Sequence, residues 1–262
     1  MHPDSNSAKY LRWALNGVLG VVFIWELVAP DSGPWLYPAL VTVAAMACIA
    51  GMTRRLPLQN VLMAAAIVAL IGGAAHSLTA KRDFGIPFGP IGFQPGSGDK
   101  IFGLLPWTMP LLWIVAVFTA RGVMRLILRP WRKTKTYGWW LIGLTAALVL
   151  AFDAALEPFA HVRHLWFWQL TKISLNWQSA PIVDLIGWYC VTLLILAFIS
   201  PFLIKKQPGR SSGSDIQPLI IWLGTLLLFA VAAAGAKLWL PVTVDAAVAA
   251  VTLVLAIRGV KW

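Results

Sequence analysis

Residues 137–157 read YGWWLIGLTAALVLAFDAALE, and this stretch decides the class of fold. It is apolar for long enough to cross the ~30 Å hydrocarbon core of a bilayer as one helix. Its only ionisable carboxyl side chains, Asp153 and Glu157, come at its end. Seven further apolar stretches resemble it in length and composition, at 10–29, 36–52, 58–80, 104–128, 181–204, 218–237 and 241–260. We therefore expect about eight transmembrane helices.

The composition supports the same conclusion. Of the 262 residues, 59% are hydrophobic and 12% are charged, whereas charged residues make up about 25% of an ordinary soluble domain. A water-soluble fold of this length has too little interior for so much apolar surface. We predict an all-α, polytopic integral membrane helical bundle, with residues 1–262 forming a single transmembrane domain.

The net charge of +11 first suggests nucleic acid, but membrane topology explains it better. With the N-terminus in the cytoplasm and eight crossings, 15 of the 21 basic residues fall on the cytoplasmic side. The positive-inside rule then predicts that both termini are cytoplasmic and that the protein lies in the inner (cytoplasmic) membrane. We expect the lipid bilayer as a partner and no nucleic acid. The basic stretch 121–135 either grips anionic headgroups or serves only as a topology signal, and the second interpretation is favoured.

The acidic residues gather on the other side of the membrane in this topology. Asp153 and Glu157 are four residues apart and so share one helix face. Two carboxyls so close are expected to leave one of them protonated, as a general acid requires. A structural role, such as pairing with Arg163, is the equal alternative. Asp184 lies about one turn into the stretch 181–204, at the same level.

Aromatic residues crowd the connections on that side. The segment 161–180 contains Trp166, Trp168, Asn176 and Trp177, which we expect to form a lid over the carboxyls or to anchor the chain at the interface. The segment 84–93 is apolar but rich in Gly and Pro, which favours a re-entrant or interfacial connection. Cys48 and Cys190 indicate no disulfide or zinc site. His161 and His164 could bind a metal together with Glu157, but a solvated loop is the favoured interpretation of these histidines. We expect neither a metal nor a cofactor.

Several short motifs occur in a recognisable order. They are Gly85-Ile-Pro-Phe-Gly89, Leu105-Pro-Trp107, Pro110-Leu-Leu-Trp113, Asp153-Ala-Ala-Leu-Glu-Pro158, Trp166-Phe-Trp168 and Gly187-Trp188. Over residues 58–199 the chain resembles the bacterial and archaeal membrane carotenoid biosynthesis proteins, which include carotenoid 1,2-hydratases and the hydratase of bacterioruberin synthesis. It departs from their usual pattern at Ser179, where Gly is common, and at Asp184, where Asn is common.

The resemblance implies a hydro-lyase that adds water across the terminal double bond of a lycopene-like polyene. It implies three catalytic residues, with Asp153 or Glu157 as the acid and Asp184 orienting water. The substrate-binding residues would be Phe88, Trp113, His161, Trp166, Trp168, Asn176, Trp177 and Trp188. Two alternatives stay open: a non-catalytic carotenoid-binding membrane subunit, and a carotenoid cyclase or isomerase that uses the same cation. A transporter is disfavoured because the sequence shows no internal repeat.

Overall fold

The computed structural model of the chain describes residues 6–29, 32–80, 86–169, 175–203 and 215–261. Eight α-helices account for most of them, which confirms the predicted fold class. Seven are long and apolar enough to cross a membrane, and α2 is a shorter apolar helix. The helices are α1 (Asn6–Val28), α2 (Leu36–Met52), α3 (Leu58–Thr79), α4 (Thr108–Ile127), α5 (Tyr137–Val162), α6 (Ile182–Ile199), α7 (Gln217–Gly235) and α8 (Trp239–Val260).

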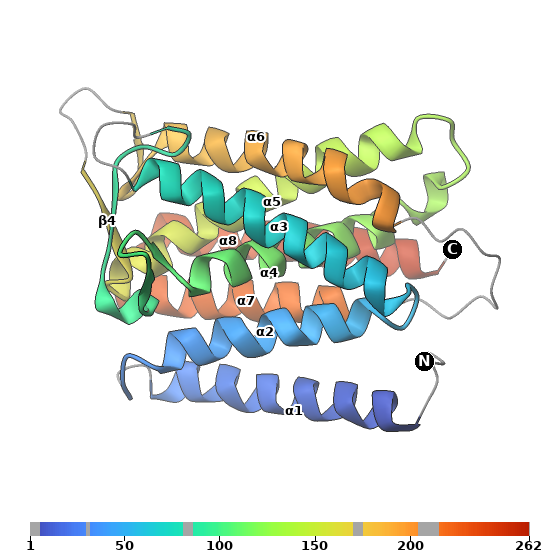
Figure 1. Cartoon of the computed structure of the whole chain (residues 1–262), viewed down its shortest axis with the longest axis horizontal. Coiled ribbons are helices and arrows are strands. Elements are labelled where there is room, and N and C mark those ends of the chain that lie inside the picture. The colour runs from blue at the N-terminus through green and yellow to red at the C-terminus, as the bar shows by residue number, and fades with distance from the viewer. Residues whose placement is uncertain (1–5, 30–31, 81–85, 170–174, 204–214, 262) are drawn as a thin grey trace.

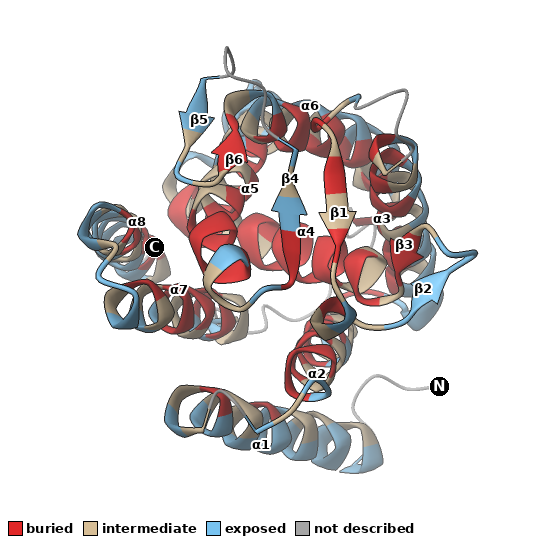
Figure 2. Ribbon diagram, turned by 90° about the vertical axis from the view of Figure 1, so that its left-hand side faces the viewer, coloured by how far each residue is buried: buried red, intermediate tan, exposed pale blue. Residues whose placement is uncertain are grey.

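The helices run side by side along one axis (Figure 1). The first described turn of α1 and the last turn of α8 lie at the same end of this bundle. Eight crossings require this arrangement. Viewed along the axis, α4 lies in the middle of the bundle and α1 at its rim (Figure 2). Accordingly α4 is buried at most positions, whereas α1 buries only Leu19 and Glu26.

The end of the bundle opposite the termini has a cover of short strands (Figure 1). Three two-stranded antiparallel ladders form there: β1 with β4, β2 with β3, and β5 with β6. The strands are β1 (Ile91–Phe93), β2 (Lys100–Ile101), β3 (Leu105–Pro106), β4 (Trp166–Trp168), β5 (Asn176–Trp177) and β6 (Ala180–Pro181), and short 3-10 turns are η1 (Pro95–Ser97), η2 (Arg129–Trp131) and η3 (Ser200–Leu203). The sequence analysis did not predict these strands.

The β1–β4 ladder matters most for the site. It pairs Phe93 with Trp166 and Ile91 with Trp168, which joins the connection after α3 to the connection after α5. Because side chains alternate along a strand, Trp166 and Trp168 point to the same face of β4. The ladder therefore fixes both indoles over the ends of the helices.

The end of α5 differs from the expectation. The predicted apolar stretch ends at Glu157, directly before Pro158, but α5 continues through Pro158 to Val162. That interpretation was wrong because inside a membrane no water replaces the backbone hydrogen bonds that unwinding would break. A helix there continues past the proline and loses only the one backbone hydrogen bond that proline cannot donate. His161 consequently belongs to the last turn of α5 and not to the following loop.

Candidate functional site

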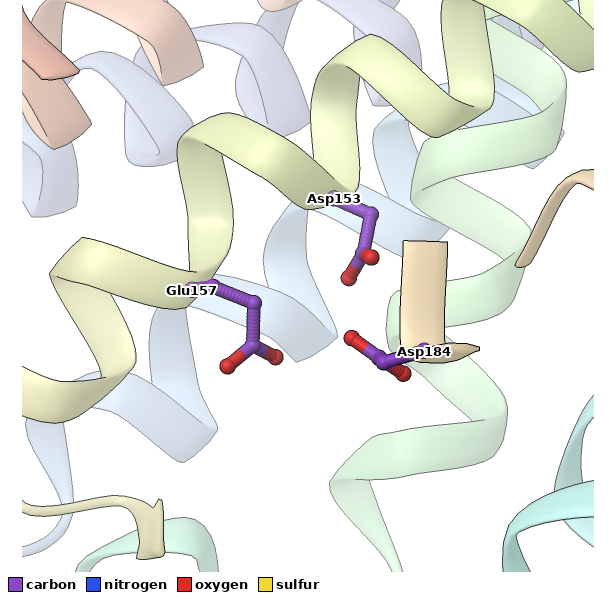
Figure 3. A group of neighbouring side chains, drawn as sticks. All are labelled: Asp153, Glu157 and Asp184. Atoms are coloured by element: carbon purple, nitrogen blue, oxygen red, sulfur yellow. The ribbon is translucent and has the colours of Figure 1, made fainter. Parts of the chain in front are cut away.

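Three carboxyl groups meet between α5 and α6. Asp153 and Glu157 extend from α5 and Asp184 from the first turn of α6, and the three side chains point toward one another (Figure 3). One carboxyl oxygen of each lies within 4.8 Å of one from each of the others. Asp153 and Asp184 are completely buried and Glu157 almost so. The expected shared face of Asp153 and Glu157 is thus turned toward a third acid on a neighbouring helix.

Glu157 is held by two indoles. Trp166 donates its Nε1–H to Oε1 of Glu157 at 3.0 Å, and Trp168 donates to Oε2 at 2.7 Å. Both oxygens therefore act as acceptors, which is the arrangement of an ionised carboxylate. The alternation along β4 explains how one strand supplies both donors. The predicted lid of tryptophans does lie on a carboxyl group.

Asp153 and Asp184 have a different environment. Among the described residues, Asp153 and Asp184 interact with each other, and Trp188 acts as a donor toward Asp184. The two carboxyl groups face each other (Figure 3). Three negative charges this close and this well buried repel one another strongly. The cluster must therefore keep at least one proton or hold a cation. A proton shared between two facing carboxyls is the arrangement of an acid catalyst.

Carboxylate oxygens at this spacing also fit a hard divalent cation. Among the His, Cys, Asp and Glu residues that the structure describes, these three form the one group close enough to share a metal ion. The alternative set considered from the sequence, His161 and His164 with Glu157, is not brought together. His161 and His164 are exposed, whereas Glu157 is buried.

An aromatic cluster adjoins the carboxyls. Trp113 of α4 and Trp188 of α6 stack with ring centroids 4.0 Å apart, and Phe88 packs against both. All three side chains are buried. Trp188 lies one turn after Asp184, and its Nε1–H acts as a donor toward that carboxyl. Trp188 thus links the aromatic cluster to the carboxyl groups.

Glycines make this cluster possible. A Cβ on Gly72 would lie 2.3 Å from the Trp113 ring, and a Cβ on Gly187 would lie 2.5 Å from the Phe88 ring. Any larger residue at either position would displace an aromatic ring. The Gly187-Trp188 motif therefore has a packing role, since its glycine seats Phe88 and its tryptophan completes the stack.

His76 is a member of the site that the sequence analysis missed. It is buried on α3, and Trp113 donates its Nε1–H to His76 Nδ1 at 3.1 Å. Because an indole nitrogen can only donate, Nδ1 is the acceptor and the imidazole is neutral. His76 also contacts the rings of Phe88, Phe93 and Trp188. The available signal was a polar residue at the end of an apolar stretch, at the level of the acids.

The other predicted site residues divide into two groups. Trp177 is half-buried and donates its Nε1–H to the backbone oxygen of Ala154 at 2.8 Å, so it braces α5 beside the carboxyls. Asn176 and His161 have exposed side chains and do not join the buried cluster. The structural alternative for Asp153 and Glu157 is a pairing with Arg163. In the structure Arg163 forms an ion pair with Glu26 of α1.

A family model described as carotenoid biosynthesis protein matches residues 35–253. The chain belongs to the carotenoid biosynthesis protein family. The matched segment contains the three carboxyls, the tryptophans of β4 and the aromatic cluster, and it begins after α1. No match was found among curated proteins or among solved structures.

This carotenoid biosynthesis protein also has an apolar crevice along one side of α5. Phe152, Leu156 and Phe159 line it from α5, and further walls come from α1, α2, α4 and α7. At about 100° per residue, these three residues occupy a stripe of α5 next to that of Asp153 and Glu157. Tyr37, which lines the crevice, interacts electrostatically with Glu157, so the crevice borders the carboxyl cluster.

Proposed function

We propose that this protein is a carotenoid hydratase, which adds water across the terminal 1,2 double bond of a linear, lycopene-like carotene. Membership of the carotenoid biosynthesis family supports a carotenoid substrate. The observation that carries the hydratase proposal is the buried pair of Asp153 and Asp184, which face each other between α5 and α6. Such a pair shares a proton and can deliver it.

The reaction requires the protein to give one proton to the substrate and to take one proton back from it. The carboxylic acid of Asp153 gives its proton to the alkene carbon that bears one hydrogen, and the π electrons form the new C–H bond. The neighbouring carbon becomes a tertiary cation. A water oxygen then bonds to that cation, and the protonated alcohol returns a proton to a carboxylate of the pair. The net change is the addition of one water, and no redox cofactor is required.

The surrounding residues have separate tasks in this proposal. Asp184 shares the proton and orients the water, and the Nε1–H of Trp188 is a donor toward the same carboxyl. Glu157, fixed by Trp166 and Trp168, supplies a constant negative charge that stabilises the cation. The aromatic faces of the cluster shelter the cation from premature quenching. Of the two acids considered from the sequence, Asp153 fits the donor role better, because both oxygens of Glu157 already accept hydrogen bonds.

The location also suits the substrate. A linear carotene is an apolar rod that dissolves in the bilayer, and seven of the described helices are long and apolar enough to span one. We place the chain in the cytoplasmic membrane with both termini in the cytoplasm, because the basic residues concentrate at the end where α1 begins and α8 ends. A C-terminal fusion to a reporter that is active only in the cytoplasm tests this orientation, and the reporter should be active. An inactive reporter on a chain that is expressed would mean that the C-terminus lies on the opposite side of the membrane.

The decisive experiment is co-expression with lycopene synthesis, followed by mass spectrometry of the pigments. Wild-type protein should yield a carotenoid heavier by one water, whereas Asp153→Asn and Asp184→Asn should lose this product. Asp99→Asn is the matched control, since Asp99 is an exposed acid on the same side of the membrane. If both cluster variants match wild type at equal expression, the acid assignment fails.

Other products would point to the two alternatives. A product with the mass of the substrate but a changed structure means that the cation loses a proton instead of capturing water, as in a cyclase or isomerase. Carotenoid that co-purifies unchanged means a binding subunit. Because the proposal relies on protons, treating membranes with EDTA should leave hydration within about two-fold of the untreated rate. Loss of activity on chelation, with recovery on adding a divalent cation, would assign the three carboxyls to a metal.

A further inference from the structure

The apolar crevice beside α5 takes no part in the proton transfers proposed above. It is partly open, with about 370 Å³ of empty space including its open side. Its lining covers similar lengths of two helices, since Tyr37 and Ala44 on α2 are seven residues apart, as are Phe152 and Phe159 on α5. At 1.5 Å per residue, each run covers about 10 Å. The crevice therefore follows the helices for about 10 Å, in the half of the bundle that contains the carboxyls.

Aromatic rings form a continuous wall of this crevice. The ring of Tyr37 lies 6.4 Å from that of Phe159, measured between centroids. Phe229 of α7 lies 4.9 Å from Phe159, and Phe152 lies 5.5 Å from Phe229. These are the separations of aromatic rings in direct contact. The four rings therefore join into one apolar surface that starts at Tyr37 and continues along the crevice.

The hydroxyl of Tyr37 is the polar feature of this wall. Two residues of the lining carry a hydroxyl, Tyr37 and Thr225. Thr225 donates its own to the backbone oxygen of Ile221 at 2.8 Å, whereas the Tyr37 hydroxyl has no hydrogen-bond partner within the described residues. The Tyr37 side chain is only 7% exposed, and a buried tyrosine hydroxyl normally has a partner. Because Tyr37 interacts electrostatically with Glu157, this hydroxyl lies where the crevice meets the carboxyl cluster.

This combination suits an apolar chain that gains an oxygen at one end. Ligand sites are mostly apolar and aromatic, with a few polar groups that fix the orientation of the ligand. A flat conjugated chain can lie against ring faces along its length, which distinguishes it from a flexible saturated lipid tail. A carotene is about as long as the ~30 Å hydrocarbon core, so the crevice holds one end section and the rest stays in the lipid. Membership of the carotenoid biosynthesis family supplies a ligand of this class.

We propose that the crevice binds the end section of the polyene chain, and that the Tyr37 hydroxyl is the hydrogen-bond partner of the oxygen that hydration adds. The terminal double bond then lies at the junction of the crevice with the carboxyl cluster. The inference rests on the proposed function, because hydration at the carboxyls supplies this oxygen. It predicts that the protein binds the hydroxylated product more tightly than the carotene.

Ligand binding to the purified full-length Asp153→Asn protein tests this without turnover. Lycopene and its 1-hydroxy derivative are titrated separately, and quenching of tryptophan fluorescence reports binding. The hydroxy derivative should bind about 2- to 10-fold more tightly, the range for one neutral hydrogen bond. Adding Tyr37→Phe keeps the ring and removes the hydroxyl, so this preference should disappear while lycopene affinity stays the same. A preference that persists in Tyr37→Phe, or that is absent when Tyr37 is present, overturns the assignment of Tyr37.

A second pair of variants tests the crevice itself. Ala44→Leu fills it and should weaken the binding of both ligands about ten-fold, as overpacking by about 1–3 kcal/mol implies. Ala147→Leu adds the same volume at an exposed position of α5 and should bind as the parent protein does. Phe23→Ala, at a partly buried position of the crevice wall on α1, serves if Ala44→Leu does not fold, and it should also weaken lycopene binding. Unchanged lycopene affinity in the folded variant overturns the crevice as the binding site.

The remaining controls separate the ligand and the reaction. The saturated hydrocarbon with the skeleton of lycopene should compete poorly, and equal competition means that the crevice takes any apolar chain, so the polyene assignment is wrong. If wild type binds lycopene in the crevice but yields no hydrated product, the hydratase proposal fails and the crevice stands. If Ala44→Leu hydrates lycopene at the wild-type rate, the crevice assignment fails and the hydratase proposal stands.

Discussion

The two ends of the bundle both bury charge, but they relieve it by different means. At one end Asp153, Glu157 and Asp184 crowd together, and at the other Arg121 is buried on α4, one turn before Arg125. A carboxyl group can take up a proton and stop repelling its neighbours, whereas an arginine keeps its charge at any physiological pH. The acidic end can therefore hold and transfer protons. The basic end can only hold a counterion.

The comparison extends to the hydrogen-bond partners. Glu157 has two indole donors placed by one strand, while Asp153 and Asp184 face each other, with Trp188 as a donor toward Asp184. Within the acidic end, then, one carboxyl is built to stay charged and two are built to share a proton. Such a division of roles between neighbouring carboxyls is what acid catalysis requires.

The largest expected effect is at the shared pair. Asp153→Asn and Asp184→Asn should each lower hydration by about 10²–10⁴-fold, the range for loss of a general acid. Because the two act as one unit, the double variant should be no slower than the worse single variant. Hydrated carotenoid per amount of membrane protein is the measurement. Losses that multiply would show that the two carboxyls work independently.

The indole clamp on Glu157 should come next. Trp168→Phe or Trp166→Phe removes one N–H donor from a buried charged acceptor, a loss of about 1.5–3 kcal/mol, and hydration should fall roughly 10- to 100-fold at unchanged expression. Trp177→Phe is the matched control, because its N–H bonds a backbone oxygen and not a carboxylate. A Trp177→Phe defect as large as the other two would mean that the indoles serve only to hold the connections together.

Packing around the aromatic cluster should give a smaller effect, on stability. Gly72→Ala places a methyl group 2.3 Å from the Trp113 ring and should cost about 1–3 kcal/mol through overpacking. Gly143→Ala on α5 meets nothing within 4 Å and should be neutral or slightly stabilising, as alanine favours helices. Melting temperatures in one detergent compare the two. Equal values would mean that Trp113 can move without cost.

Features that depend on neighbouring residues in the chain could be predicted from the sequence, whereas contacts between distant segments could not. The helices followed from apolar length, and the common face of Asp153 and Glu157 followed from their spacing, because both are local properties of the chain. That Asp184 joins them depends on how α6 packs against α5. The missed strands are two or three residues long, too short for any pattern. The β1–β4 ladder forms only because two distant connections pair, whereas β2–β3 and β5–β6 are hairpins within one connection.

The same reasoning explains the individual errors. Pro158 is a helix breaker in water, but the membrane removes the alternative hydrogen bonds that let a chain unwind there. Asn176 and His161 were chosen for their chemistry and sequence position, and their exposure could not be read from either. His76 was passed over because its importance lies in its hydrogen bond with Trp113, which belongs to a different helix.

The smallest expected effect is a change in stability at the basic end of the bundle. Asp215→Asn removes the ion pair with Arg54, whose side chain is 43% exposed, and a pair of this kind contributes about 0–1 kcal/mol. Asparagine keeps the Oδ1 that accepts the backbone N–H of Gln217, so the start of α7 should hold. The melting temperature in detergent should therefore change by less than it does for Gly72→Ala. A fall as large as that of Gly72→Ala would mean that Asp215 stabilises the basic end by more than one exposed ion pair.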